Sequence, residues 1–203
     1  EWWGLNDYVR ARARMLAELG YVALAVDMYG EGKTAEHPED AQKFMMEVMG
    51  HKEEGQKRFD AGMALLKANP HTDPERIAVI GYCMGGAIAL HVVRAWESIP
   101  LVAVFHSSLG TQTPLQPGAS KGKILVFHGG SDPFVPAAQV EAFRQEMDAA
   151  GANYAIYEYA AAKHGFTNPG ATELGTKFNL PLAYDEAADK ESWATFLEAM
   201  KAL

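Results

Sequence analysis

Short apolar runs alternate with amphipathic segments along most of the chain. The apolar runs predict strands at residues 21–26, 76–80, 101–105, 124–128 and 154–159. The segments around them space their apolar residues as helices do, and predict helices at residues 5–19, 38–49, 53–68, 84–96, 136–150 and 185–202. This alternation is typical of right-handed βαβ units. We therefore predict one α/β domain over residues 1–203, with a mostly parallel central sheet and helices on both faces.

The first helix and the first strand are bounded by clear local signals. Asn6 is the expected N-cap of the helix at residues 5–19, and Gly20 is its expected stop. The run at residues 21–26 is continuously apolar, which is the pattern of a strand buried on both faces. A glycine-containing loop is expected at residues 27–33.

Composition and charge narrow the possible partners. The chain has 203 residues, of which 48% are hydrophobic, and its formal net charge is -8. Because no basic block is available to neutralise phosphates, we expect neither a nucleic-acid nor a membrane partner. No apolar stretch approaches the roughly 20 residues that cross a bilayer. One cysteine excludes an internal disulfide and a multi-thiolate metal site.

The chain begins Glu1-Trp2-Trp3-Gly4, with no initiator methionine, basic region or apolar signal core. We expect an upstream segment to precede this numbering. A cytoplasmic location is our expectation, with a signal peptide in that upstream segment as the open alternative.

The single cysteine stands in Gly81-Tyr82-Cys83-Met84-Gly85, a G-x-C-x-G pattern between an expected strand and an expected helix. The G-x-S-x-G elbow uses the same strand-turn-helix geometry to hold a nucleophile above the sheet edge. Flanking side chains would collide in such a turn, so we expect glycine to be needed on both sides. A helix N-terminus also favours a thiolate. The alternative is that Cys83 is a small buried apolar residue, as most lone cysteines are.

A cysteine nucleophile needs a base and a carboxylate that orients the base. In elbow hydrolases the order along the chain is nucleophile, acid, histidine. Asp132 follows the strand at residues 124–128, and His164 follows the strand at residues 154–159, so both fit this order. Taken alone, Asp132 before Pro133 could be a turn former, and His164 could be a solvated loop residue.

The remaining histidines fit the order less well. His106 and His128 stand at strand ends and could line a pocket, while the other four lie in helical or charged surroundings. The chain contains no H-E-x-x-H, EF-hand, Walker or G-x-G-x-x-G pattern. We therefore predict no metal and no nucleotide cofactor.

Four motifs together resemble the dienelactone hydrolase family, a branch of the α/β-hydrolase fold. They are "EWWGLND", "GYCMGG", "HGGSDPFVP" and "AAKHGFTNP", and in order they cover essentially the whole chain. The resemblance implies Cys83 as nucleophile, His164 as base and Asp132 as its orienting acid. It also implies that Glu1 bonds the resting thiol, and that the backbone N–H groups of Met84 and Trp2 form the oxyanion hole. In the family, the upstream segment supplies the first strands of the sheet.

One departure from the family concerns the substrate. Family members bind a substrate carboxylate with arginines, one of them four residues after the catalytic histidine, where this chain has Asn168. Lys163 or Lys43 could substitute as point charges. We instead expect a small neutral ester or lactone, bound among residues that stand beside the catalytic motifs: Trp3, Tyr29, Phe134, Phe166 and Asn168. For Trp3 and Phe166 the alternative is a place in the core.

Other functions stay open or fail on the sequence. A glutamine amidotransferase also shows G-x-C-x-G, but it requires H-x-E, and His164 is followed by Gly165 and Phe166. The alternatives that stay open are a catalytically silent binding protein of the same fold and a hydrolase of a different small ester or thioester. We expect a monomer or a small homo-oligomer.

Overall fold

The computed structural model describes residues 1–95 and 99–203. Tertiary contacts divide these residues into two compact units, Glu1–Arg76 and Ile77–Leu203, which are described separately below. The single domain expected over residues 1–203 stays a prediction. Trp96, the expected last residue of one helix, lies outside the described residues.

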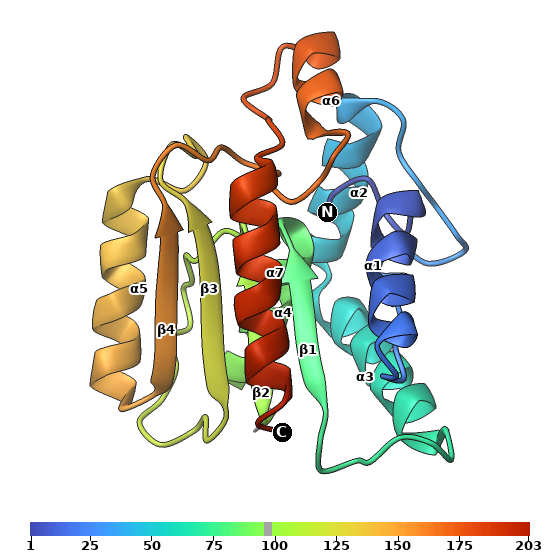
Figure 1. Cartoon of the computed structure of the whole chain (residues 1–203), viewed down its shortest axis with the longest axis vertical. Coiled ribbons are helices and arrows are strands. Elements are labelled where there is room, and N and C mark those ends of the chain that lie inside the picture. The colour runs from blue at the N-terminus through green and yellow to red at the C-terminus, as the bar shows by residue number, and fades with distance from the viewer. Residues whose placement is uncertain (96–98) are drawn as a thin grey trace. The chain divides into compact units, whose positions relative to one another are not determined.

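The second unit is built on a parallel sheet of four strands in the order β1-β2-β3-β4. The strands are β1 (Ala78–Tyr82), β2 (Leu101–Phe105), β3 (Lys123–Gly129) and β4 (Asn153–Tyr159), as Figure 1 shows. All of β2 and all but the first residue of β3 are buried. Such burial explains why both strands are continuously apolar instead of alternating.

Each strand contributes one aromatic side chain to a row near the carboxyl end of the sheet. The register places Phe105 opposite both Tyr82 and Phe127, and places Phe127 opposite Tyr157. Neighbouring rings are stacked, with centroids 4.8, 4.6 and 5.3 Å apart in strand order. Because parallel strands end at the same edge of a sheet, the residues that directly follow this row emerge side by side.

Helices cover both faces of the sheet (Figure 1). They are α4 (Met84–Ala95), α5 (Ala137–Ala150) and α7 (Glu186–Met200), whereas α6 (Ala171–Phe178) lies beyond the carboxyl ends of the strands. In α7, Phe196 is fully buried, with its ring centroid 6.2 Å from that of Phe105. Helices α4 and α5 meet through Arg94, whose guanidinium lies 5.7 Å from the centre of the Phe143 ring.

The elements of this unit confirm most of the expected ones. The strand expected at residues 76–80 runs from 78 to 82 instead, because its ladder to β2 begins at Ala78 and continues through Gly81 to Tyr82, two residues expected in the turn. Helix α6 is not among the helices that the sequence predicts, and its Gly175 lowers the helix propensity of this segment. Gly175 is nonetheless required there, because a Cβ at this position would lie 2.4 Å from the carbonyl oxygen of Leu182.

The first unit contains the three helices that the sequence predicts, α1 (Asp7–Glu18), α2 (Pro38–Gly50) and α3 (Lys52–Ala68). The expected cap of α1 is confirmed, since the Asn6 side-chain oxygen accepts from the backbone N–H of Val9 at 3.4 Å. Gly20 has φ +91° beyond the end of α1, as expected of a stop residue. Pro38 opens α2, where its missing N–H is not needed.

The strand expected at residues 21–26 is wrong, because the structure assigns no regular secondary structure there. Val22 and Leu24 are 37% and 39% exposed, so the segment is not buried on both faces. A strand needs a hydrogen-bonded neighbour as well as an apolar sequence, and within the described ranges these residues pair with no strand. The loop expected at residues 27–33 is present. The Asp27 carboxylate organises it by accepting from three of its backbone N–H groups at 2.8–3.1 Å.

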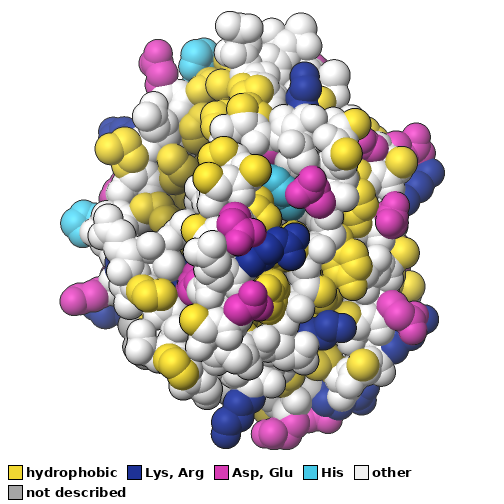
Figure 2. Space-filling model, turned by 90° about the vertical axis from the view of Figure 1, so that its left-hand side faces the viewer, with side chains coloured by type: hydrophobic (Ala, Val, Ile, Leu, Met, Phe, Trp, Pro, Cys, Tyr) yellow, Lys and Arg dark blue, Asp and Glu magenta, His cyan; other side chains and the backbone are white. Residues whose placement is uncertain are grey.

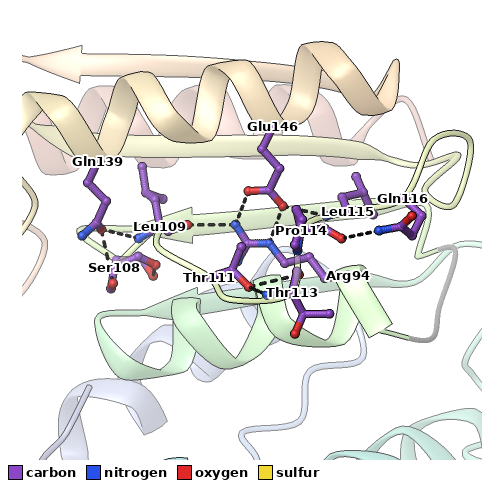
Figure 3. Close-up of polar contacts among 11 residues, drawn as sticks. Arg94, Ser108, Leu109, Thr111, Thr113, Pro114, Leu115, Gln116, Gln139 and Glu146 are labelled. Atoms are coloured by element: carbon purple, nitrogen blue, oxygen red, sulfur yellow. Dashed lines mark hydrogen bonds and ion pairs between the residues drawn. The ribbon is translucent and has the colours of Figure 1, made fainter.

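A buried ion pair fixes the long segment between β2 and β3, residues 106–122 (Figure 3). Arg94 and Glu146 meet in bidentate fashion, with Nε to Oε1 and Nη2 to Oε2 both at 2.7 Å. Arg94 also donates to the carbonyl oxygen of Leu109, and Glu146 accepts from the N–H of Leu115, both at 2.8 Å. Because each charge is paired and hydrogen-bonded, the pair can stay buried while it ties this segment to α4 and α5.

Candidate active site

Cys83 occupies the tight turn between β1 and α4. Its φ is +53°, in the left-handed region that residues other than glycine rarely adopt. Its N–H donates to the Phe105 carbonyl at 3.0 Å, and its own carbonyl accepts from the N–H of Gly86 at 3.1 Å. Helix α4 begins at the next residue, Met84. A strained turn from a strand into a helix is the geometry of a nucleophile elbow.

Two glycines beside Cys83 are required by the space around them. A Cβ at Gly81 would lie 2.3 Å from the carbonyl oxygen of Gly85, and one at Gly86 would lie 2.5 Å from Cβ of Ser107. The expectation that Gly85 is needed for the same reason is wrong, since a Cβ there meets no atom of the described chain within 4 Å. The crowding therefore lies on the β1 side of the turn and where α4 meets the segment after β2.

Asp132 and His164 form a buried hydrogen-bonded pair. The distance from His164 Nδ1 to Asp132 Oδ2 is 2.7 Å, and the residues are 8% and 4% exposed. The second carboxylate oxygen accepts from the N–H of Phe134 at 2.8 Å. A carboxylate in this position fixes the orientation of the ring and leaves Nε2 as the nitrogen available for proton exchange.

The surroundings of His164 favour its protonated form. Burial acts to lower the pKa of His164, but the Cys83 charge, hydrogen bonds to Asp132 and Cys83, and the Asp132 charge together raise it to about 10. An imidazolium that contacts both Asp132 and Cys83 can stabilise a thiolate at Cys83.

We expect His164 to stay protonated through neutral pH and to lose its proton near pH 10. Because this pKa lies above the usual 6.5, the bound proton stabilises the folded chain fully below about pH 6.5. That contribution is lost as the pH rises through about 10. NMR titration of ¹⁵N-labelled histidine measures the pKa, and His164→Gln assigns the signal. Cys83→Ala should move the titration to lower pH. A wild-type pKa near 6.5 would contradict this expectation.

Further side chains pack against His164. The ring of Phe134 lies 5.1 Å from that of His164 at 89°, and Phe134 is 51% exposed. On another side the ring of His106 lies 5.3 Å away at 69°. The sequence indicated His106 as a residue that could line a pocket, but Thr167, which contacts it, was not singled out. Only the position of Thr167 three residues after His164 could have drawn attention to it.

The other residues expected to contact substrate are mostly buried. Phe166 is 0% exposed and Trp3 is 4% exposed, which favours the alternative that each belongs to a core. Asn168 is 6% exposed, and its side-chain oxygen accepts from the N–H of Gly170 at 2.9 Å, so it has a local structural contact. Lys163 and Lys43 are both exposed.

Glu1, Trp2, Trp3 and Tyr29 lie in the first unit and are described within it. The Tyr29 hydroxyl donates to the Trp2 carbonyl at 2.6 Å, and the Trp3 carbonyl accepts from the N–H of Ala35 at 3.0 Å. The rings of Trp2 and Trp3 meet edge to face at 5.3 Å. These contacts hold the start of the chain against the segment at residues 29–35. The roles of Glu1 and Trp2 toward Cys83 stay predictions.

Within residues 1–95 and 99–203, no group of three or more His, Cys, Asp or Glu side chains is arranged to hold a metal ion. None of the helices in those ranges combines the length and apolar character that a membrane span requires. On the face shown in Figure 2, basic and acidic side chains are intermixed with apolar ones.

The chain is similar to a known protein family and to several individual proteins. A model of the Dienelactone hydrolase family matches residues 1–203. The solved structure titled m3DLH is 33% identical and has a TM-score of 0.91; the match covers 100% of this chain and 83% of that one. The dienelactone hydrolase-like promiscuous phosphotriesterase P91 from metagenomic libraries is 30% identical, has a TM-score of 0.86 and is covered to the same extents. Uncharacterized protein K02A2.1 of Caenorhabditis elegans is 31% identical over 71% of this chain and 90% of its own length.

Proposed function

Because the chain belongs to the dienelactone hydrolase family, and so has the α/β-hydrolase fold and acts on ester or lactone bonds, we propose that it uses a Cys83-His164-Asp132 triad. The proposed intermediate is a thioester acyl-enzyme. The observation that carries the proposal is the arrangement around His164. Its Nδ1 is bonded to Asp132 at 2.7 Å, while Cys83 raises its pKa.

Acylation begins when the Cys83 thiolate attacks the carbonyl carbon of the ester. A C–S bond forms, and the carbonyl electrons move onto oxygen. The C–O bond to the leaving alcohol then breaks, and the His164 imidazolium gives its proton to the departing oxygen. The products of this step are the free alcohol, the thioester on Cys83 and a neutral His164. With a lactone, the alcohol stays attached to the acyl group.

Deacylation uses His164 in the opposite direction. The neutral imidazole takes a proton from a water molecule, whose oxygen attacks the thioester carbonyl. The C–S bond breaks, the carboxylic acid leaves, and the thiolate and imidazolium return. Throughout both steps the Asp132 carboxylate holds Nδ1 and stabilises the imidazolium, without taking its proton.

The negative oxygen formed in both steps needs backbone donors. We assign this role to the N–H groups of Met84 and Trp2, and the resting-state contact with the thiol to Glu1. Support for Met84 is its place as the first residue of α4, directly after Cys83. Support for Trp2 is that its own carbonyl accepts from the Tyr29 hydroxyl and the Trp3 carbonyl accepts from the N–H of Ala35, which holds the backbone beside the Trp2 N–H.

The proposed substrate is a small neutral ester or lactone. Its support is Asn168, which stands where the family's second arginine would be and carries no positive charge; its side-chain oxygen accepts from the N–H of Gly170. A carboxylate stripped of water without a guanidinium partner would cost several kcal/mol. Phe134 offers an exposed aromatic surface beside His164, which rewards apolar contact instead.

A substrate panel tests both the reaction and this preference. It contains p-nitrophenyl acetate, a dienelactone carboxylate and the neutral methyl ester of that lactone, each assayed with and without iodoacetamide. We expect iodoacetamide to abolish all turnover. We also expect kcat/KM for the methyl ester to exceed that for the free acid by about tenfold or more, which corresponds to about 1.4 kcal/mol.

The other outcomes are equally informative. Preference for the free acid would mean that a cation binds its carboxylate, and Lys163→Ala and Lys43→Ala would then identify which lysine. Turnover of none of these esters would favour the catalytically silent binding protein. Turnover that survives complete alkylation of Cys83 would contradict the cysteine mechanism.

A further inference from the structure

His106 occupies a strained and fully buried position at the end of β2. It is 0% exposed, and its φ of +39° lies in the left-handed region. Its N–H donates to the Phe127 carbonyl at 2.9 Å, while the preceding Phe105 carbonyl accepts from the N–H of Cys83 at 3.0 Å. Strain of this kind persists only where the surroundings hold the residue firmly. The backbone at His106 is therefore tied to the turn that carries Cys83.

The side chain of His106 connects this position to the loop that carries His164. Its Nε2 lies 2.8 Å from Oγ1 of Thr167, which is 1% exposed. Buried hydrogen bonds in such low-dielectric surroundings hold their partners firmly, because breaking one leaves both groups unsatisfied. The His106–Thr167 contact thus links the end of β2 to residues 164–167.

The ring of His164 is enclosed on two sides by aromatic rings. His106 meets it at 5.3 Å and 69°, and Phe134 meets it at 5.1 Å and 89°. Phe134 is 51% exposed, so solvent borders it on one side, whereas His106 is fully buried. The hydrogen bond to Asp132 fixes Nδ1 but still allows the ring to tilt about that bond. A rigid neighbour on the buried side restricts the tilt.

We infer that His106 and Thr167 are positioning residues, which act together to hold the His164 ring so that Nε2 meets the Cys83 thiolate and the leaving oxygen. The inference rests on the proposed function of Cys83 and His164. Neither His106 nor Thr167 exchanges a proton with substrate in this scheme. Their contribution is to the rate of the chemical steps, because misplacing a catalytic group by about 1 Å costs up to about 10²-fold.

Two matched pairs of variants separate the effect of the His106–Thr167 hydrogen bond on catalysis from its effect on folding. Thr167→Val keeps the β-branched shape and removes the hydroxyl, while Thr167→Ser keeps the hydroxyl. His106→Asn suits a left-handed backbone but is too short to reach Thr167, while the amide of His106→Gln reaches as far as Nε2 does. Thr113→Val, at an exposed threonine, controls for the substitution itself.

We expect kcat for p-nitrophenyl acetate to fall about tenfold or more in Thr167→Val and His106→Asn, with KM changed less than about twofold. Thr167→Ser and His106→Gln should recover most of the lost kcat. The pH profile for alkylation of Cys83 by iodoacetamide should move to higher pH in Thr167→Val, because a displaced imidazolium stabilises the thiolate less. A merely structural role would lower the melting temperature and leave this profile unchanged.

Equal kcat in Thr167→Val and Thr167→Ser, with unchanged alkylation profiles, would overturn the inference. If Thr167→Val does not fold, the comparison of His106→Asn with His106→Gln decides the question by the same criteria. Cys83→Ala is assayed alongside. Full activity in Cys83→Ala defeats the proposed function itself, whereas an inactive Cys83→Ala beside a fully active Thr167→Val defeats only the positioning role.

Discussion

Cys83→Ala is expected to lower kcat/KM for ester hydrolysis by about 10⁴-fold or more, the loss typical of removing a triad nucleophile. Alanine has no group that can form the acyl intermediate. The change should leave the fold intact, because the left-handed backbone at this position already carries a Cβ. Circular dichroism and thermal melting of Cys83→Ala check this before the kinetics are compared.

Mass spectrometry gives an independent measurement of the same assignment. A mechanism-based acylating probe should add one acyl group to the wild-type chain and none to Cys83→Ala, since Cys83 is its one cysteine. Full activity in Cys83→Ala would falsify the assignment of Cys83 as nucleophile. An adduct on a serine or lysine would point to a different nucleophile with the same fold.

His164→Ala is expected to cost nearly as much as Cys83→Ala, and the double variant little more than either alone. The reason is that the two side chains act as one unit, and losses within a triad are strongly non-additive. Asp132→Asn should also lower kcat severely, because an amide no longer stabilises the imidazolium that its 2.7 Å contact supports.

The measurement is a double-mutant cycle on kcat/KM with Cys83→Ala, His164→Ala and the combined variant. His71→Ala, at an exposed histidine, is the matched control and should have no effect in either background. Additive losses for Cys83 and His164 would mean that the histidine performs a separate task, such as positioning the substrate.

The sequence predicts best the strands that are apolar and buried along their whole length. Strand β2 was expected at residues 101–105 and has those bounds. Its five residues are all apolar and buried, and the apolar run is flanked by Pro100 and His106. The run at residues 21–26 looks similar but forms no strand, since its apolar residues do not specify a hydrogen-bonded neighbour. Apolar content alone therefore predicts neither burial nor strand pairing at residues 21–26, because both depend on the rest of the fold.

The candidate site, too, could be predicted only in part. Cys83, Asp132 and His164 each follow a strand of one parallel sheet, which predicts that they lie at the same edge, and the hydrogen bond between Asp132 and His164 agrees with this. The contact between His106 and Thr167 was not predictable in this way. It depends on the order of the strands in the sheet and on a left-handed residue at the end of β2, which no local pattern indicates.

The in-register row of aromatic residues also determines where the chain can change length. A one-residue deletion inside β2 would draw His106 back by about 3.3 Å and reverse the face to which every later side chain of the strand points. The turn at residues 116–119 is exposed and follows Leu109 and Leu115, which the Arg94–Glu146 ion pair holds. An insertion after Gly118, whose N–H donates to the Ala150 carbonyl, would leave these contacts in place. Homologous chains should therefore differ in length in this turn and agree, residue for residue, between Pro100 and Ser107.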